Sequence, residues 1–197
     1  MLSQIRPAIV STIFFTLLLG VAYPLAITGV AQVAFPDQAG GGLIHDAKGQ
    51  VIGSALIGQG FAKPEYLHPR PSAAGSNGYD ASASSGSNYG PLNPDLAKRV
   101  KGDAASLASD AGGKPIPADA LTSSGSGLDP DVSPENARMQ ASRIAKARGA
   151  DPAKVEALVA DHVEPAFLGF IGQPHVNVLK TNLALDAAFG KAQPHPR

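Results

Sequence analysis

The chain opens with an apolar segment that has no counterpart in the rest of the sequence. Between Arg6 and Asp37 there is no charged residue, and most side chains in this interval are apolar. A helix needs about 20 apolar residues to cross a hydrocarbon core about 30 Å thick, and the stretch from Ala8 to Thr28 meets that requirement. The pattern therefore predicts a single N-terminal transmembrane helix, with residues 7–35 forming the helix and its outer extension.

Two interpretations of this segment are open: an uncleaved membrane anchor or a secretory signal. Residues 29–31, Gly-Val-Ala, could serve as a signal cleavage site. The apolar core of a secretory signal has only about 7–15 residues, however, and the run from Ala8 to Thr28 is longer. We therefore favour the anchor, and an exported form is the alternative.

Small and hydroxyl residues recur every four positions along the segment, at Thr12, Thr16, Gly20 and Pro24. Such a stripe lets another transmembrane helix approach closely, although small residues are common in membrane helices in any case. Pro24 removes a backbone hydrogen bond, and neighbouring helices make that loss easier to tolerate. These four residues are our candidates for helix packing.

The flanking charges predict the orientation of the segment. Arg6 and the amino terminus are the positive charges nearest to it, and both precede it. The positive-inside rule places such charges in the cytoplasm. Residues 1–6 are therefore expected to form a cytoplasmic tail, and residues 36–197 an extracytoplasmic, periplasmic domain.

The residues after the apolar segment predict one loop-rich α+β domain. Short apolar runs on both sides of a turn at Gly49 are typical of a β-hairpin over residues 43–57. Helical spacing predicts a helix after Ser133, a good N-cap that is followed by Pro134. The same criterion predicts three more helical segments. They cover residues 95–108, a stretch that begins at residue 152 and includes Val163 on its buried side, and residues 176–189.

Composition narrows the possible partners and chemistry. The 16 basic and 16 acidic residues balance, and no block of like charge stands out, so no nucleic-acid partner is expected. Cysteine is absent, which excludes disulfides and zinc–thiolate sites. The five histidines have no HExxH or other metal-ligand spacing, and no serine stands in a GxSxG elbow. We therefore expect no catalytic residue and no metal site in this chain.

Two candidate functional residues lie in a proline-containing loop. Gln59 stands in a GQGF stretch, and Arg70 stands between two prolines. Because flanking prolines restrict the backbone, the guanidinium of Arg70 could be held out to bind a carboxylate or a carbonyl. That ligand could belong to a partner or to the chain's own loops.

Two loops rich in glycine and serine supply the remaining candidates. Ser87 and Asn88 lie in SGSNYGPLNP, which would suit a weakly bound hard cation, a partner's loop or a simple turn. Ser126 and Asp129 lie in SGSGLDP, which resembles a phosphate cradle. A Walker loop needs GxxxxGK[ST], however, and no lysine follows these glycines. The preferred interpretation is that Asp129 closes a turn ahead of the next helix.

The helix predicted after Ser133 also carries a polar set, Arg138, Gln140 and Arg143. These side chains could face a partner. Surface helices usually present such residues to solvent, so a solvated polar face is the default prediction.

Four motifs that follow the apolar segment in order resemble a known family. They read LIGQGFAKPEYLHPRPSA, SGSNYGPLNPDL, LTSSGSGLDPDVSPENARMQASRIAKARG and PHVNVLKTNLALD. Together they are similar to KdpC, the C subunit of bacterial Kdp potassium-transporting ATPases, over nearly the whole chain. Gln173 and His175 stand where glutamate and arginine are common in that family, which weakens a charge-based role for their loop.

The resemblance implies an accessory, non-catalytic subunit of a high-affinity ATP-driven potassium importer in the cell inner membrane. Its partners would be a channel-like potassium-translocating subunit, a P-type ATPase subunit, a small membrane subunit and the lipid bilayer. ATP and potassium would belong to the complex, and no cofactor is assigned to this chain. In that family the C subunit is needed for assembly of the complex. It is also described as a catalytic chaperone that raises the ATP affinity of the ATPase subunit.

The predicted orientation limits how that last role could work. ATP is cytoplasmic, whereas the folded domain is expected outside, so we favour an outer contact with the channel-like subunit over an ATP pocket. Coupling would then act at a distance, through a shared conformational equilibrium. The alternatives from other classes are a membrane-tethered hydrolase that uses a serine of the SGSG loop, and an exported ligand-binding domain.

Overall fold

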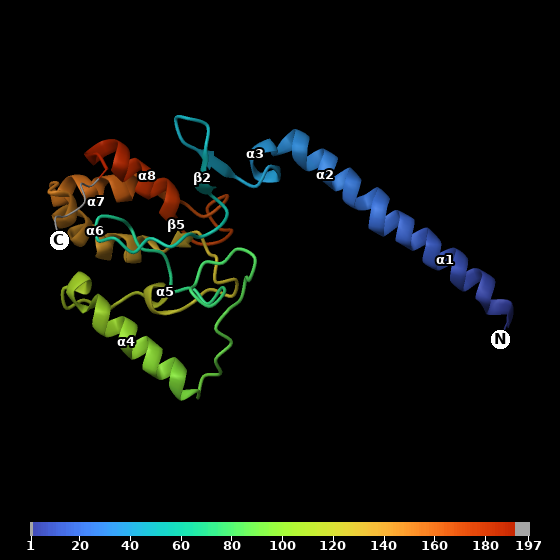
Figure 1. The fold of residues 1–197 in the computed structure, drawn as a ribbon, viewed down its shortest axis with the longest axis horizontal. Helices are drawn as coiled ribbons and strands as arrows, with labels where there is room; N and C mark the ends of the chain where they lie inside the picture. The colour runs from blue at the N-terminus through green and yellow to red at the C-terminus, as the bar shows by residue number, and fades with distance from the viewer. Residues whose placement is uncertain (1, 192–197) are drawn as a thin grey trace. The chain divides into compact units, whose positions relative to one another are not determined.

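The computed structural model describes residues 2–191 and separates the chain into two compact units, one up to Val51 and one from Ile52. Figure 1 shows the elements in chain order, from the blue α1 to the red α8. One long apolar helix is followed by short strands and further helices. This order confirms the predicted α+β class.

A continuous apolar helix makes up most of the first unit. It consists of α1 (Ile5–Leu17), a π-helical turn η2 (Leu18–Ala22) and α2 (Tyr23–Ala34), with a 3-10 turn η1 (Leu2–Gln4) before it and the short α3 (Pro36–Ala39) after it. Its 30 residues extend about 45 Å. The helix is long and apolar enough to cross a membrane, and none of it is buried within the protein. Among residues 2–191 it is the only such helix, as the sequence predicts.

The π-helical turn lies just before Pro24. Proline has no backbone N–H, so the carbonyl of Gly20, four residues earlier, has no helical donor at its usual position. Within the turn, the N–H of Tyr23 donates to Leu18, which is the i→i+5 bond of a π-helix. The helix therefore passes the proline without ending.

The predicted hairpin is present, with a shorter second strand. β1 (Leu43–His45) pairs with β2 (Val51–Ser54). The Asp46 carboxylate accepts two backbone N–H groups of the turn, at 2.8 and 2.9 Å, and Gly49 has the φ of +78° that favours glycine. The second strand stops at Ser54, before the predicted end, because its hydroxyl accepts the backbone N–H two residues later and starts a turn.

The second unit contains a three-stranded antiparallel sheet that the sequence did not predict. Its strand order is β3 (Asp131–Val132), β5 (His175–Asn177), β4 (Val163–Glu164). In the central strand, Val176 lies opposite Val132 on one side and Val163 on the other. Strands of two or three residues are too short to show an alternating pattern.

Two residues that were predicted in helices belong to this sheet instead. Val163 lies in β4, because the preceding helix ends at Asp161. Val176 lies in β5, because the side chain of Asn177 accepts a hydrogen bond from the N–H of Lys180 (3.1 Å) and so begins the last helix after itself. The predicted helices exist, but their boundaries were wrong at these two places.

The core lies between three helices, α6 (Pro134–Arg148), α7 (Pro152–Asp161) and α8 (Val178–Phe189). Ser133 caps α6, since its hydroxyl accepts the N–H of Asn136 at 3.1 Å, which confirms the prediction. α7 contacts both α6 and α8, and Figure 1 shows the three helices together in orange to red. The buried hydrophobic cluster consists of Leu67, Val132, Ala137, Ala141, Ile144, Ala145, Val155, Val159, Val176, Val178 and Leu185.

Two more helices complete the second unit, α4 (Pro94–Ala111) and α5 (Ala118–Leu121). Asn93 caps α4 by accepting the N–H of Asp95 at 2.8 Å. An ion pair of 2.7 Å between Asp110 of α4 and Arg143 of α6 joins the two helices. The apolar positions predicted for α4 are half-buried, namely Leu96, Val100 and Leu107.

Two buried amide side chains hold the loop 64–70 against the helices. Asn182 of α8 accepts the N–H of Leu67 (2.7 Å) and donates to its carbonyl (3.0 Å). Gln140 of α6 makes the same two bonds with the backbone of His68, at 2.8 and 3.1 Å. Each amide satisfies the loop backbone as a neighbouring strand would.

The prediction of a solvated polar face on α6 is wrong for two of its three residues. Gln140 is only 3% exposed. Arg143 donates to the carboxylate of Asp110 and, at 3.1 Å, to the carbonyl of Tyr66. Arg138 alone of the three has a largely exposed side chain. Gln140 and Arg143 are internal contacts, because they bind a loop that is distant in the sequence.

Candidate functional site

The loops selected from the sequence meet in the second unit. The N–H of Gly58 donates to the carbonyl of Leu128 (2.8 Å), and the N–H of Ser85 donates to that of Ser126 (2.9 Å). The GQGF, SGSN and SGSGLDP stretches are therefore neighbours in space. The candidate residues Gln59, Asn88 and Ser126 come from three loops that share one region of the fold.

The loops approach one another closely at three glycines, Gly58, Gly86 and Gly127, which we call the glycine junction. A Cβ at Gly58 would lie 2.6 Å from the carbonyl oxygen of Asp129, and one at Gly127 would lie 2.8 Å from the backbone nitrogen of Ala74. Gly127 also has a φ of +67°, which glycine adopts without strain. The space that a phosphate cradle would need beside Gly127 is filled by the chain's own backbone.

Ser72 and Tyr79, which were not among the candidates, hold their loop onto the glycine junction. The hydroxyl of Ser72 donates to the carbonyl of Gly127 (2.6 Å) and accepts the N–H of Tyr79 (2.8 Å). The Tyr79 hydroxyl donates to the carbonyl of Arg70 (2.6 Å). Burial raises the pKa of Tyr79 to about 12, so this phenol stays protonated and remains a donor at neutral pH.

Arg70 binds both kinds of ligand that the sequence suggested, and both come from its own chain. Its Nη1 lies 2.7 Å from Oδ2 of Asp129, and its Nε and Nη2 each lie 3.4 Å from the carbonyl oxygen of Thr122. Both partners of the ion pair are partly buried. The candidates Arg70 and Asp129 therefore form one unit that ties two loops together.

Asp129 also forms the turn that was predicted for it. Its other oxygen, Oδ1, accepts the N–H of Asp131 at 3.1 Å, which is an Asx-type turn that leads into β3. The two oxygens of one carboxylate thus serve the loop contact and the turn at the same time.

Asp119 of α5 is a residue that the sequence analysis missed. Its carboxylate accepts the N–H (2.8 Å) and the hydroxyl (2.9 Å) of Ser133, and the side-chain amide of Asn136 (3.0 Å). A negative charge is favourable at a helix N-terminus, and here it fixes the start of α6. No spacing in the sequence connects Asp119 with this helix.

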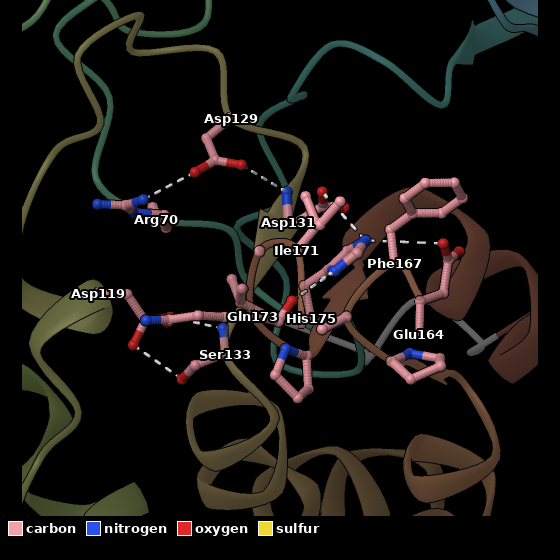
Figure 2. A pocket seen from close by; sticks show the side chains of 15 residues that line it. Arg70, Asp119, Asp129, Asp131, Ser133, Glu164, Phe167, Ile171, Gln173 and His175 are labelled. Atoms are coloured by element: carbon pink, nitrogen blue, oxygen red, sulfur yellow. Dashed lines mark hydrogen bonds and ion pairs between the residues drawn. The ribbon is translucent and has the colours of Figure 1, made fainter. Parts of the chain in front are cut away.

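An open cavity of about 550 Å³ lies beside the Arg70–Asp129 pair. In Figure 2, His175 reaches between two carboxylates; its Nε2 lies 3.8 Å from Oδ2 of Asp131 and 3.6 Å from Oε2 of Glu164. The charged or titratable residues of the lining are Arg70, Asp119, Asp129, Asp131, Glu164 and His175, and its apolar side includes Phe167 and Ile171.

The carboxylates of this cavity differ in their electrostatic surroundings. Burial raises the pKa of Asp131. The pKa of Glu164 is lowered, first by the hydrogen bond from Lys180 (2.9 Å). Among residues 2–191, no group of three or more histidine, aspartate or glutamate side chains is placed to hold a metal ion. The arrangement is a set of ion pairs around an open hollow, suited to hydrogen bonding with a partner.

The serines of the SGSG loop are engaged in their own turn. The hydroxyl of Ser124 accepts the N–H of Gly127 (2.9 Å), and that of Ser126 accepts the N–H of Leu128 (3.1 Å). A nucleophilic serine needs a base within hydrogen-bond reach. Neither hydroxyl has a histidine partner in the described structure, so this geometry does not favour a hydrolase.

The remaining loop candidates have local roles. The amide nitrogen of Gln59 donates to the carbonyl of Ile52 (3.2 Å), while its amide oxygen is buried without a hydrogen-bond partner. Asn88 is exposed and has a φ of +51°, a conformation that asparagine tolerates better than most residues. Ser87 is half-buried beside it. A partner contact by Ser87 and Asn88 stays a prediction.

The four residues of the stripe lie along the apolar helix and are exposed. Thr12 and Thr16 lie in α1, Gly20 in η2 and Pro24 in α2. A Cβ at Gly20 would meet no other atom within 4 Å. Their role in helix packing stays a prediction.

Comparison with known proteins places the chain in a family. The sequence pattern of a family described as "K+-transporting ATPase, c chain", KdpC, matches residues 5–187. The chain belongs to the KdpC family. The match begins in α1 and ends in α8, so the KdpC pattern includes the apolar helix and all the loops of the candidate site.

Individual KdpC proteins are similar over almost their whole length. The potassium-transporting ATPase KdpC subunit of Caulobacter sp. (strain K31) is 66% identical over 189 residues, 96% of each chain. That of Beijerinckia indica is 60% identical over 196 residues, 98% of each chain. That of Gemmatimonas aurantiaca is 53% identical over 188 residues, 95% of this chain and 94% of the relative.

Protonation of His68 is expected to destabilise the loop that carries Arg70. Burial and then the neighbouring Arg143 lower the pKa of His68, and the hydrogen bond with the carbonyl of Lys63, followed by Asp110 and Glu65, opposes this more weakly. A histidine whose folded pKa lies below its unfolded value of about 6.5 contributes stability above that pH, and the contribution is lost as the pH falls. We expect the free energy of unfolding to fall more steeply in the unmodified chain than in His68→Gln as the pH drops below about 6.5. Parallel curves for the two proteins would contradict the assignment.

Proposed function

We propose that this chain is an accessory, non-catalytic subunit of a high-affinity ATP-driven potassium importer, needed for the assembly and stability of the complex. The observation that carries the proposal is the KdpC match over residues 5–187. Relatives up to 66% identical are named as KdpC subunits of potassium-transporting ATPases. The ion-paired cavity and the engaged SGSG serines agree with a binding role.

The proposed location is the cell inner membrane, with a single membrane pass. The helix Ile5–Ala34 has the length and apolar character of a span, and Arg6 precedes most of it. By the positive-inside rule, residues 1–6 would form a cytoplasmic tail, residues 7–35 the span with its outer extension, and residues 36–197 a periplasmic domain.

The proposed partners are a channel-like potassium-translocating subunit, a P-type ATPase subunit and a small membrane subunit. The apolar helix would pack in the bilayer through the stripe, and the loops around Gln59, Asn88 and Ser126 would contact the channel-like subunit outside. ATP and potassium would be bound by the complex. If this chain raises the ATP affinity of the ATPase subunit, the effect would then be allosteric and would act through the complex without direct contact with ATP.

The proposal is tested by complementation and purification. In a strain that lacks only this gene, a tagged copy should restore growth at micromolar potassium and copurify with the large membrane subunits and potassium-stimulated ATPase activity. Recovery of the tagged chain alone, with no such activity, would contradict the proposal. An amino terminus that begins near Gln32 would instead support the exported alternative.

Gly20→Leu is expected to weaken assembly. Small residues at helix contacts let backbones approach closely, so a leucine at position 20 would hold a neighbouring helix away and lower the amount of copurifying subunits. Gly29→Leu is the matched control, because Gly29 lies on the same helix, has no atom within 4 Å of its Cβ position and stands outside the stripe. Equal copurification of the two variants would argue against the stripe.

A further inference from the structure

The loop between β4 and β5 presents a group of large apolar side chains to solvent. Residues 165–174 read PAFLGFIGQP and carry no charge. Phe167 and Leu168 are each 69% exposed, Phe170 is 77% exposed and Ile171 is 51% exposed. We call these four residues the apolar tip. Single exposed apolar residues are normal, but a contiguous group of this kind marks a contact with a protein or a membrane.

The apolar tip is a closed turn. Phe167 and Ile171 exchange two backbone hydrogen bonds, both of 2.9 Å, and the N–H of Gly169 donates to Ala166 at 2.9 Å. Leu168 has a φ of +53°, which is unfavourable for a residue with a Cβ. Figure 2 shows Phe167 on the side of the cavity away from Arg70. The fold therefore holds these exposed side chains in a defined conformation, with Phe167 and Ile171 at the cavity.

The chemistry of the apolar tip fits a lipid surface better than a protein surface. The energetic hot spots of protein interfaces are enriched in Trp, Tyr and Arg, and the tip has none of them. Phe and Leu are typical of the apolar face of membrane-surface segments. Unsatisfied backbone groups are costly in lipid, and the N–H groups of three of the four tip residues, Phe167, Phe170 and Ile171, have partners within the turn.

A short tether would keep the second unit close to the bilayer. Residues 35–51 connect the apolar helix to it, and this segment would span roughly 60 Å even if fully extended. A unit of this size has a radius of gyration of about 15 Å. The unit would therefore stay within a few of its own radii of the lipid surface, where a high effective concentration makes a modest contact sufficient.

We infer that the apolar tip, Phe167, Leu168, Phe170 and Ile171, inserts into the boundary between headgroups and acyl chains of the bilayer that holds the chain's own helix. The inference rests on the proposed membrane anchor. A second point of contact beside the anchor restricts how the second unit can turn above the lipid surface.

The absence of tryptophan from the chain allows a direct test, because each substitution to tryptophan creates a single fluorescent reporter. The full chain is reconstituted in phosphatidylcholine vesicles with and without brominated acyl chains. We expect brominated lipid to reduce the emission of Phe170→Trp at least twofold and the emission maximum to lie to the blue of that in water. Leu92→Trp, at a position 96% exposed, should be unaffected. Ile13→Trp, in α1, reports insertion of the apolar helix.

The tryptophan reporters test the membrane anchor and the lipid contact of the tip separately. If Ile13→Trp is not quenched, the anchor fails, and the tip inference fails with it. If Ile13→Trp is quenched while Phe170→Trp behaves like Leu92→Trp, the anchor stands and lipid insertion of the tip is overturned. Emission of Phe170→Trp that shifts to the blue only in the assembled pump, without quenching by brominated lipid, would also overturn it, because the tip would then contact a protein.

A second substitution tests whether the apolar character of the tip is the cause. Leu168→Asp, added to Phe170→Trp, places a charge in the tip at a backbone conformation that aspartate tolerates better than leucine. We expect the quenching at position 170 to be lost, while circular dichroism and the Ile13→Trp signal stay unchanged. Persistent quenching would overturn the inference.

Discussion

Replacement of Arg148 by leucine is expected to lower the free energy of unfolding by about 3–5 kcal/mol, the usual cost of removing one partner of a buried ion pair. The Arg148 side chain is 1% exposed and lies 2.9 Å from the carboxylate of Asp186. It also donates to the carbonyls of Glu65 (2.7 Å) and Gly190 (2.8 Å), and it stacks over the ring of Tyr66. Leucine would leave a mostly buried carboxylate and these carbonyls without their donor.

The matched control is Arg138→Leu in the same helix. Its side chain is 55% exposed, and its ion pair with Glu135 is 3.9 Å long, so the change should stay within about 0.5 kcal/mol. Both variants would be unfolded in urea in mild detergent and followed by circular dichroism. Similar midpoints for the two variants would contradict the structural role of Arg148. Arg148→Lys should be intermediate, because it keeps the charge but lacks the planar fork.

Gly127→Ala is expected to cost about 3 kcal/mol. The left-handed conformation alone costs an alanine about 1–2 kcal/mol, and the new methyl group would meet the backbone nitrogen of Ala74 at 2.8 Å and the carbonyl of Ser85 at a still shorter distance. Neither backbone group can move away as a flexible side chain would. Relief of the contact would separate the loops that the glycine junction holds together, at a further cost of about 1–3 kcal/mol.

Gly125→Ala provides the comparison in the same loop. Its Cβ position has no atom within 4 Å and its φ is not in the left-handed region, so its stability should change by no more than about 0.5 kcal/mol. Thermal unfolding and limited proteolysis of residues 72–92 would measure the two effects. Unchanged proteolysis in Gly127→Ala would show that the glycine junction is less constrained than its geometry indicates.

The elements that were predicted correctly have local causes. The start of α6 follows from Ser133 and Pro134, the hairpin turn from Gly49, and the apolar helix from an interval without charge. The sheet of β3, β5 and β4 has no local cause of this kind. β3 lies far from β5 in the sequence, and β4 is joined to β5 by the loop 165–174. Strands of two or three residues show no pattern that would predict either pairing.

The polar residues also differ in whether their roles could be predicted from local sequence. A buried Gln140 and a solvated Arg138 have the same polar character in the sequence, and only the distant backbone of His68 distinguishes them. The sequence indicated that Arg70 would bind a carboxylate or a carbonyl, but it did not indicate that the carboxylate would be that of Asp129. The apolar tip did carry a local signal, since residues 165–174 are uncharged and contain four large apolar residues.

The π-helical turn before Pro24 changes the direction of the stripe. In a regular α-helix, residues four apart are displaced by about 40° around the axis, so a seam from Thr12 to Pro24 would wind through about 120°. The turn at Leu18–Ala22 contains more residues per revolution than an α-helix and rotates the later residues back. The seam therefore runs more nearly parallel to the helix axis, and a neighbouring straight helix could follow it along its length without coiling around it.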